Sequence, residues 1–310
     1  MKRRPVLAIS ALSRRTALGR AATVAAAVGL GKVDRAVAQD ATPMPPREER
    51  DVVYGTIGET DLLLDVARPP DRPAPRPAVI LVHGGGLVDP GPDRFSFKDA
   101  ALALATAGYV TFNIDYRLFS LFKGTNPWPA QLDDVQRAVR WVRANAAAYG
   151  VDPERIGAFG MSSGGQLVGF LGTRDTRDNS DPALAGFSSR ATCVVALAGN
   201  FDMTTPNSIP SETEIDKAVL GDNPDAAAYR DYSPITFVDS SSAPFLILQE
   251  GIDDIVPAAQ AGLMVTALQA AGVQVSYSWF PKYDHFSWLS WASEAPETLA
   301  FFGRHLRPDE

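Results

Sequence analysis

A serine flanked by small residues is the first group in this sequence of 310 residues that could do chemistry. The pattern G-x-S-x-G, in which a serine hydroxyl acts as a nucleophile, is matched by Gly160-Met161-Ser162-Ser163-Gly164. The pattern works where a strand turns sharply into a helix, because small neighbours let the serine project from the turn. A strand is predicted at 155–159 and a helix at 164–171. We therefore predict that Ser162 is a nucleophile at the end of a strand.

Three consecutive glycines form the second motif, in His83-Gly84-Gly85-Gly86. The apolar run 78–82 before them predicts a strand buried on both faces of a parallel sheet. Glycines let the backbone approach a substrate without a Cβ, so its N–H groups could stabilise an oxyanion. An ordinary glycine-rich turn or a phosphate cradle is the alternative, but no Lys-Ser or Lys-Thr pair follows. We predict oxyanion donors in the amides of Gly85, Gly86 and Ser163.

Three histidines are candidates for the general base. His83 belongs to the glycine motif, and His305 lies near the end of the last predicted helix, where a cation complements the helix dipole. His285 follows the predicted strand 273–280, and a loop at the carboxyl end of a strand can reach the serine. We expect His285 to be the base; the alternative is an ordinary surface histidine.

The acid that orients the histidine should lie between serine and histidine in the chain, after the preceding strand. Asp253 and Asp254 both follow the predicted strand 245–248. We favour Asp253, three residues before Val256, and Asp254 stays open. In such a site the carboxylate holds the imidazole tautomer and stabilises the imidazolium without taking the proton.

Apolar runs alternate with Ala-rich helical stretches between residues 51 and 305 and would position these groups. This alternation predicts an α/β fold, with a mostly parallel central sheet flanked by helices. The first two strands, 51–57 and 61–67, are expected to form an antiparallel hairpin. No core strand is predicted at 200–242, which we interpret as a small cap insertion over the edge where open α/β sheets bind ligands. Further strands are expected at 109–114 and 192–198, and helices at 99–107, 131–149, 258–271 and 296–305.

The composition, 45% hydrophobic and 21% charged, is typical of a globular protein. No run approaches the roughly 18 apolar residues of a membrane span. The first 38 residues hold eight Lys or Arg and one Asp, so the remaining residues, with 21 basic and 35 acidic side chains, carry a net charge of −14. Such a body repels phosphate backbones and anionic lipids. Neither nucleic acid nor stable membrane association is expected, and no oligomeric state is predicted.

The basic start of the chain resembles an export signal. A twin-arginine-type motif is present in Ser13-Arg14-Arg15-Thr16-Ala17-Leu18, and an A-x-A cleavage signature in Ala36-Val37-Ala38. We expect residues 1–38 to be a signal peptide, 39–49 a solvated leader and 50–310 the folded domain. An amphipathic helix of the mature fold is the alternative. The expected location is periplasmic or extracellular, and the single cysteine, Cys193, allows no intramolecular disulfide.

These motifs together resemble the α/β-hydrolase superfamily, most closely bacterial serine esterases of the hormone-sensitive-lipase and feruloyl-esterase-like group. The resemblance runs from Asp51 to His305 and includes Asp115-Tyr116-Arg117-Leu118 and Tyr232-Ser233-Pro234-Ile235. It implies an α/β-hydrolase fold and hydrolysis of a small-molecule carboxylic ester through an acyl-enzyme on Ser162. It implies no metal and no organic cofactor.

Four residues depart from the pattern of this family, namely Leu87, Met161, Glu250 and Asp284. None of them removes a catalytic group. Glu250 shifts the spacing cue that chooses between the two aspartates, and Asp284 could compete for the histidine proton.

Aromatic residues crowd two loops near the predicted site. We expect Phe119, Trp128 and Phe286 to contact the substrate in an acyl or aryl pocket; alternatively, these residues pack the cap and the last helix. A peptidase or amidase on the same fold is the second interpretation of function, and a binding protein without catalysis is the third.

Overall fold

The structure is a computed structural model that describes residues 44–70, 75–204, 213–221, 223–287 and 291–307. The predicted signal peptide, 1–38, and the first five residues of the predicted leader lie outside the described residues. Among the residues that the structure describes, no helix is long and apolar enough to cross a membrane.

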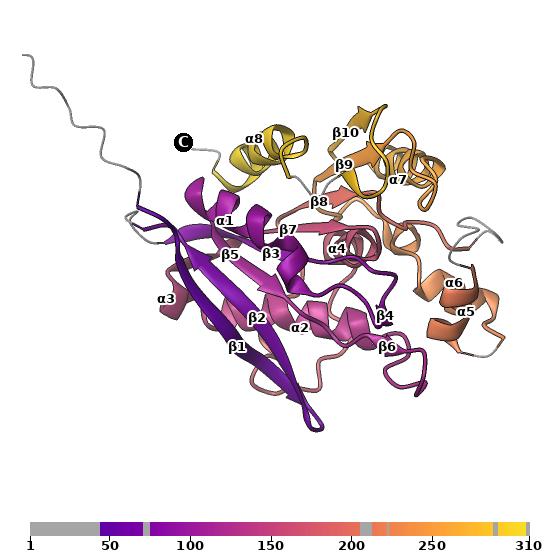
Figure 1. The fold of residues 1–310 in the computed structure, drawn as a ribbon, viewed down its shortest axis with the longest axis horizontal. Helices are drawn as coiled ribbons and strands as arrows, with labels where there is room; N and C mark the ends of the chain where they lie inside the picture. The colour runs from indigo at the N-terminus through magenta and orange to yellow at the C-terminus, as the bar shows by residue number, and fades with distance from the viewer. Residues whose placement is uncertain (1–43, 71–74, 205–212, 222, 288–290, 308–310) are drawn as a thin grey trace, which may run out of the picture. The chain divides into compact units, whose positions relative to one another are not determined.

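A sheet of eight strands forms the centre of the fold, in the order β1-β2-β5-β3-β7-β8-β9-β10 (Figure 1). All neighbouring pairs from β5 to β10 are parallel, so the predicted fold class is confirmed. The strands are β1 (Arg47–Ile57), β2 (Thr60–Arg68), β3 (Arg76–Val82), β5 (Val110–Ile114), β7 (Val151–Met161), β8 (Cys193–Leu197), β9 (Phe245–Glu250) and β10 (Val275–Phe280). Sequence reasoning missed a second, two-stranded sheet, made by β4 (Val88–Asp89) and β6 (Phe119–Ser120).

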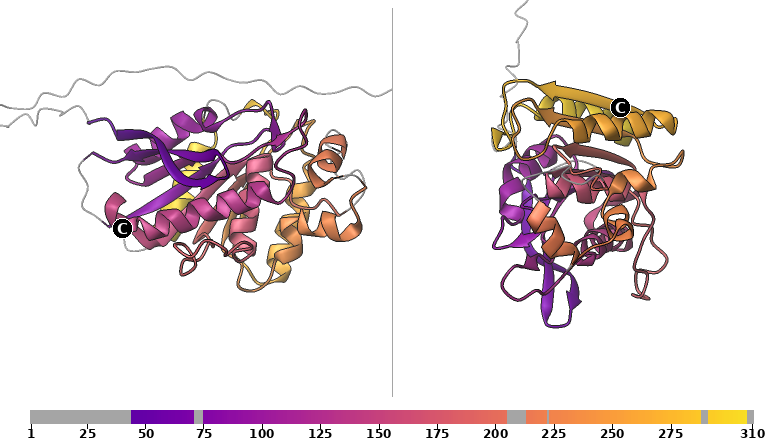
Figure 2. Two further views of the ribbon diagram at one scale, coloured as in Figure 1. Left: turned by 90° about the horizontal axis from the view of Figure 1, so that it is seen from below. Right: turned by 90° about the vertical axis from the view of Figure 1, so that its right-hand side faces the viewer.

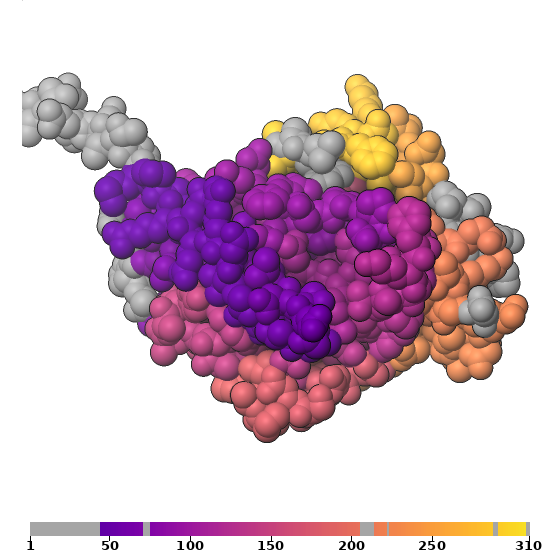
Figure 3. All heavy atoms as spheres, turned by 60° about the horizontal axis from the view of Figure 1, so that its bottom comes forward, coloured from indigo at the N-terminus to yellow at the C-terminus, as the bar shows by residue number. Residues whose placement is uncertain are grey.

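The antiparallel hairpin predicted at the start of the domain is formed by β1 and β2, and β2 also pairs antiparallel with β5. The hairpin lies on the surface, as the indigo band in Figure 3 shows. Because β1 begins at Arg47, three residues of the predicted leader belong to the sheet, which corrects that boundary.

Helices cover both faces of the sheet (Figure 2). One face packs against α1 (Lys98–Thr106) and α8 (Ala295–Leu306), whose Leu104, Phe301 and Phe302 are buried. The other face packs against α2 (Ala130–Ala144), α4 (Ser163–Thr173) and α7 (Ala259–Ala270).

The helix predicted at 131–149 is divided into α2 and α3 (Ala146–Tyr149) at Asn145. The Asn145 side-chain amide donates to the carbonyl of Trp141 at 2.8 Å. Local contacts of this kind compete with helical hydrogen bonds, which accounts for the break.

The segment between β8 and β9, predicted as a cap, contains α5 (Thr213–Leu220), α6 (Ala226–Asp231) and the 3-10 turn η2 (Pro234–Phe237); residues 205–212 and 222 lie outside the described part. The orange helices α5 and α6 lie beside the β4–β6 sheet in Figure 1. A backbone hydrogen bond of 2.9 Å from Trp128 N–H to the Val219 carbonyl joins α5 to the segment between β6 and α2.

Candidate active site

Ser162 stands between β7 and α4 in a backbone conformation that few side chains adopt, with φ 56° and ψ −126°. The glycines of its motif make this turn possible. A Cβ on Gly160 would lie 2.3 Å from the Gly164 carbonyl oxygen, and a Cβ on Gly164 would lie 2.1 Å from the Val82 oxygen. The turn therefore requires glycine on both sides of the serine, and it places Ser162 at the carboxyl edge of the sheet.

Three side chains from different strand ends meet at this edge. His285 Nε2 lies 3.1 Å from Ser162 Oγ, and His285 Nδ1 lies 2.7 Å from Asp253 Oδ2. All three are nearly buried: Ser162 is 5% exposed, His285 is 4% exposed and the Asp253 side chain is 1% exposed. With Nδ1–H donating to the carboxylate, Nε2 is free to accept the serine proton, which is the arrangement of a general base and a nucleophile.

Of the two candidate acids, the structure brings Asp253 to the histidine and leaves Asp254 exposed. Asp253 Oδ1 also accepts the backbone N–H groups of Ile255 at 2.9 Å and Val256 at 2.8 Å. Its carboxylate is therefore held by hydrogen bonds on both oxygens.

Asp284, which could have competed for the histidine proton, is engaged elsewhere. Its Oδ1 accepts the Phe286 N–H and the Ser287 hydroxyl, each at 3.0 Å. Asp284 therefore closes the turn that carries His285.

Neither of the other two histidines forms a hydrogen bond to Ser162 in the described chain, and each is engaged elsewhere. His83 is 1% exposed, and its Nδ1 lies 2.8 Å from the Gly84 carbonyl oxygen. His305 packs on Phe301 within α8, where burial lowers the pKa of its ring.

The glycine loop, Gly84–Gly86, faces the serine. All three glycines line the cavity in front of Ser162, and both Gly85 (φ 112°) and Gly86 (φ 67°) have positive φ. Ser163 is the first residue of α4, where backbone N–H groups have no partner within the helix. In the described part of the chain, no backbone or side-chain acceptor binds the amides of Gly85, Gly86 or Ser163. These three amides are available to a ligand.

The cavity in front of Ser162 has a volume of about 260 Å³. Apart from the glycine loop and Ser162, its walls are mostly apolar. No Asp, Glu, Lys or Arg side chain of the described residues lines it; the apolar side chains come from Pro92, Met161, Ile215, Ile255 and Phe286. Ile215 belongs to α5, so the cap contributes to the wall.

Only one of the three aromatics predicted to contact substrate lines this cavity, namely Phe286. Phe119 is buried in β6. Trp128 packs against Phe170 and Tyr232. Trp128 therefore joins the cap to the body, as the packing alternative had it, and Phe119 is part of the β4–β6 sheet. Neither lines the cavity, which corrects the prediction that they contact substrate there.

Two carboxyl groups whose burial sequence reasoning did not predict interact with each other, and one of them, Glu250, also interacts with Asp253. Glu250, the last residue of β9, is 0% exposed, and Glu294, just before α8, is 1% exposed. Both oxygens of Glu250 and Oε2 of Glu294 have no hydrogen-bond partner among the described residues. Burial, with the charges of Asp253, Glu294 and Asp284, raises the pKa of Glu250 to about 8. Burial also raises the pKa of Glu294.

No group of three or more His, Cys, Asp or Glu side chains in the described ranges is arranged to hold a metal ion.

The fold and this arrangement of residues define a member of the α/β-hydrolase superfamily, which confirms the resemblance seen in the motifs. The chain belongs to the BD-FAE family, whose model matches residues 64–268. It is 33% identical to esterase LipQ of Mycobacterium tuberculosis over 76% of this chain and 56% of LipQ. It is 31% identical to esterase LipC of the same organism over 81% of this chain and 63% of LipC.

The chain thus spans less than two thirds of the length of these curated relatives. Among solved structures it is similar to an acetyl ester-xyloside bifunctional hydrolase from Caldicellulosiruptor lactoaceticus. That comparison has a TM-score of 0.70 at 25% identity and covers 84% of this chain and 96% of the other.

Proposed function

We propose that this protein is a carboxylic ester hydrolase that works through an acyl-enzyme on Ser162. One observation carries the proposal: the Ser162 hydroxyl lies 3.1 Å from His285 Nε2, whose other nitrogen lies 2.7 Å from Asp253. The names of the relatives, esterases LipQ and LipC, support the same class of reaction.

The reaction follows from this geometry. Ser162 Oγ attacks the ester carbonyl carbon while its proton passes to His285 Nε2, and the carbonyl π electrons move to the oxygen. His285 then gives the proton to the leaving alkoxide, so the alcohol departs and the acyl group stays on Oγ. Water, deprotonated by the same nitrogen, attacks the acyl carbon. The C–Oγ bond then breaks while His285 returns the proton to Ser162 Oγ, and the carboxylic acid is released. Asp253 stabilises the imidazolium in both halves of the reaction.

The amides of Gly85, Gly86 and Ser163 are the proposed donors to the oxyanion of each tetrahedral intermediate. They stand beside the serine, and no acceptor in the described chain occupies them. Losing one donor of this kind costs about 3 kcal/mol of transition-state stabilisation.

The cavity favours an uncharged, mainly apolar acyl group, because no charged carboxylate or cationic side chain of the described residues lines it. A charged acyl group would lose its hydration without gaining a partner. We therefore propose small neutral esters as the substrate class.

The decisive experiment compares wild type, Ser162→Ala and Ser180→Ala with p-nitrophenyl butyrate and a fluorophosphonate probe. Ser180 is an exposed serine remote in sequence from the site and serves as the control. We expect wild type and Ser180→Ala to turn over the ester and take the label, and folded Ser162→Ala to do neither. Turnover by Ser162→Ala at the wild-type rate would refute the proposal. Equal rates on a matched anilide would instead support an amidase.

We also propose export through the twin-arginine-type motif at residues 13–18. The test is a fusion of residues 1–45 to a reporter that is active only after export as a folded protein. Replacement of Arg14 and Arg15 by lysines should abolish export, and export at the unchanged rate would contradict this proposal.

A further inference from the structure

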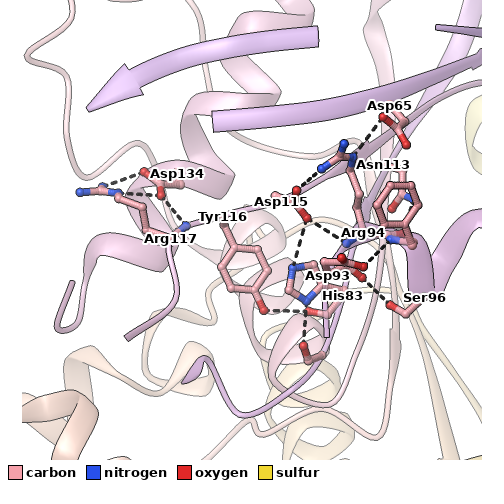
Figure 4. A network of polar contacts seen from close by, with 12 residues as sticks. Asp65, His83, Asp93, Arg94, Ser96, Asn113, Asp115, Tyr116, Arg117 and Asp134 are labelled. Atoms are coloured by element: carbon pink, nitrogen blue, oxygen red, sulfur yellow. Dashed lines mark hydrogen bonds and ion pairs between the residues drawn. The ribbon is translucent and has the colours of Figure 1, made fainter. Parts of the chain in front are cut away.

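A buried arginine organises the polar groups beside the glycine loop (Figure 4). The Arg94 side chain is 5% exposed and forms ion pairs with three carboxylates: Asp51, Asp65 at 3.0 Å and Asp115. A guanidinium keeps its charge under all ordinary conditions, so its burial is costly unless the charge is compensated, and here three carboxylates compensate it. No step of the proposed reaction involves Arg94, so the three ion pairs of Arg94 must be explained by another role.

The backbone of the same residue is fixed as well. The Arg94 N–H donates to Asp115 Oδ1 at 2.9 Å, and the Arg94 carbonyl accepts from Asn113 Nδ2 at 2.5 Å. Asp93 caps the short 3-10 helix η1 (Arg94–Phe97) by accepting the Phe95 N–H at 3.0 Å. Side chain and backbone together therefore tie residues 93–97 to the end of β5.

Residues 92–96, which include part of this fixed segment, lie against the glycine loop. The ring of Pro92 packs directly on Gly85: a Cβ there would lie 2.4 Å from Pro92 Cδ. Pro92 and Ser96 also line the cavity in front of Ser162. A shift of residues 92–96 would therefore change the wall against which Gly85 rests.

His83, which precedes the glycine loop, packs against Tyr116 and lies beside Asp115. The His83 and Tyr116 rings are stacked with centroids 4.4 Å apart, and the Tyr116 hydroxyl donates to the His83 carbonyl at 2.9 Å. His83 Nε2 lies 4.0 Å from Asp115 Oδ1, while Nδ1 donates to the Gly84 carbonyl. Burial lowers the pKa of His83, which favours the neutral ring. Asp115 thus forms an ion pair with Arg94 and lies beside the neutral His83 ring.

We propose that Arg94 is a positioning residue for the glycine loop, which through Asp115 and Pro92 holds the Gly85 and Gly86 amides where the oxyanion develops. This inference rests on the proposed function, because it assigns these amides to the transition state. Interactions made only in the transition state change kcat and leave KM nearly constant. A residue that only stabilised the fold would change neither constant in the folded protein.

The test compares Arg94→Met and Arg94→Lys with Arg137→Met, measured on p-nitrophenyl butyrate. Arg137 lies on α2 and pairs with Asp181; its side chain is 16% exposed, and it touches no residue of the site. We expect kcat to fall about 10- to 100-fold for Arg94→Met and less for Arg94→Lys, with KM within about twofold. The inhibition constant of a trifluoromethyl ketone, which forms an oxyanion on adding to Ser162 Oγ, should rise in parallel. Arg137→Met should change neither constant.

Pro92→Ala tests the same role without disturbing any ion pair, and it decides the question if both Arg94 variants fail to fold. It should lower kcat about threefold or more while KM stays near wild type. The proposal would be overturned if the folded Arg94 variants kept the wild-type kcat and the wild-type affinity for the ketone. If the Arg94 variants do not fold, the same result for Pro92→Ala would overturn it. A wild type without esterase activity would instead refute the proposed function, so the two failures are distinguishable.

Discussion

Two regions of buried charged residues lie near the candidate site, and they differ in whether each buried charge has a partner. On the side of the glycine loop, Arg94 meets three carboxylates, so charge is buried together with its compensation. On the side of Asp253, the carboxyls of Glu250 and Glu294 are buried with three oxygens that have no partner among the described residues. The first region is held in the ionised form, whereas the second region favours the protonated form.

This difference shows that burial alone does not decide what a charged residue does. Asp253 and Glu250 are three residues apart, and both are buried. Asp253 receives two backbone N–H groups and the histidine, whereas no donor of the described chain reaches the Glu250 oxygens. Hydrogen-bond donors stabilise a carboxylate, and where side-chain partners are missing the burial of Glu250 raises its pKa.

The largest expected effect sharpens the contrast between these two acids. Asp253→Asn removes the acceptor that orients His285, so kcat should fall by about 10⁴ while the protein stays folded. Asp254→Asn, which changes an exposed neighbour, should keep kcat within about twofold of wild type. Steady-state kinetics on p-nitrophenyl butyrate decides the matter. If Asp254→Asn proved the inactive variant, the assignment of the acid would be reversed.

A smaller effect is expected where the compensated region is broken. Asp115→Ala takes one carboxylate from Arg94 and the acceptor from the Arg94 N–H, and breaking a buried pair costs about 3 kcal/mol of unfolding free energy. Urea denaturation at pH 7 measures this cost. Asp181→Ala, which removes the partner of Arg137, is the matched control. The two aspartates are similarly exposed, but the Arg137 side chain is 16% exposed and that of Arg94 is 5% exposed, so this loss should cost about 1 kcal/mol or less. Equal costs for the two variants would show that Arg94 depends little on this partner.

At Glu250, which has no hydrogen-bond partner among the described residues, a substitution is expected to raise the unfolding free energy. Glu250 has a pKa of about 8 in the folded protein and 4.5 as its ordinary value, so the folded state binds the extra proton between these pH values. The unfolding free energy of wild type should therefore fall as pH rises from about 5 to 8. Glu250→Gln cannot ionise and should remove this part of the decline, gaining about 2 kcal/mol relative to wild type between pH 6 and 8.

Urea denaturation at pH 5, 6, 7 and 8 compares Glu250→Gln with the exposed control Glu297→Gln. The control should differ from wild type by about 0.5 kcal/mol or less, equally at every pH. Parallel pH curves for wild type and Glu250→Gln would mean that Glu250 is already ionised in the folded protein.

Much of the fold could be predicted from sequence because its signals are local. Apolar runs such as 78–82 and the spacing of Leu132, Val135, Val139 and Val142 specify buried strands and one helix face. The candidate site followed, because the carboxyl ends of parallel strands meet at one edge. The positions of Ser162, His285 and Asp253 could therefore be inferred from the strands before them.

What sequence reasoning missed depends on contacts between distant segments. No local pattern shows that Ile215 of the cap reaches the cavity, or that Trp128 packs against Phe170 instead. Strand β4 has only two residues and is too short to show a periodic pattern of apolar residues. Glu250 did carry a signal, an acid two residues after the apolar strand residues 245–248, but only the fold shows that its oxygens are buried with no hydrogen-bond partner among the described residues.

The apolar wall around Ser162 also bears on how a turnover ends. Under the proposed function, hydrolysis would convert a neutral ester into a carboxylic acid that ionises, and the new anion would stand among Pro92, Met161 and Ile255. No Lys or Arg of the described residues lines this cavity to pair with it, and Asp253 already occupies the Nδ1 side of His285. Ionisation of the product therefore favours its release, so the acid products should inhibit the proposed reaction poorly.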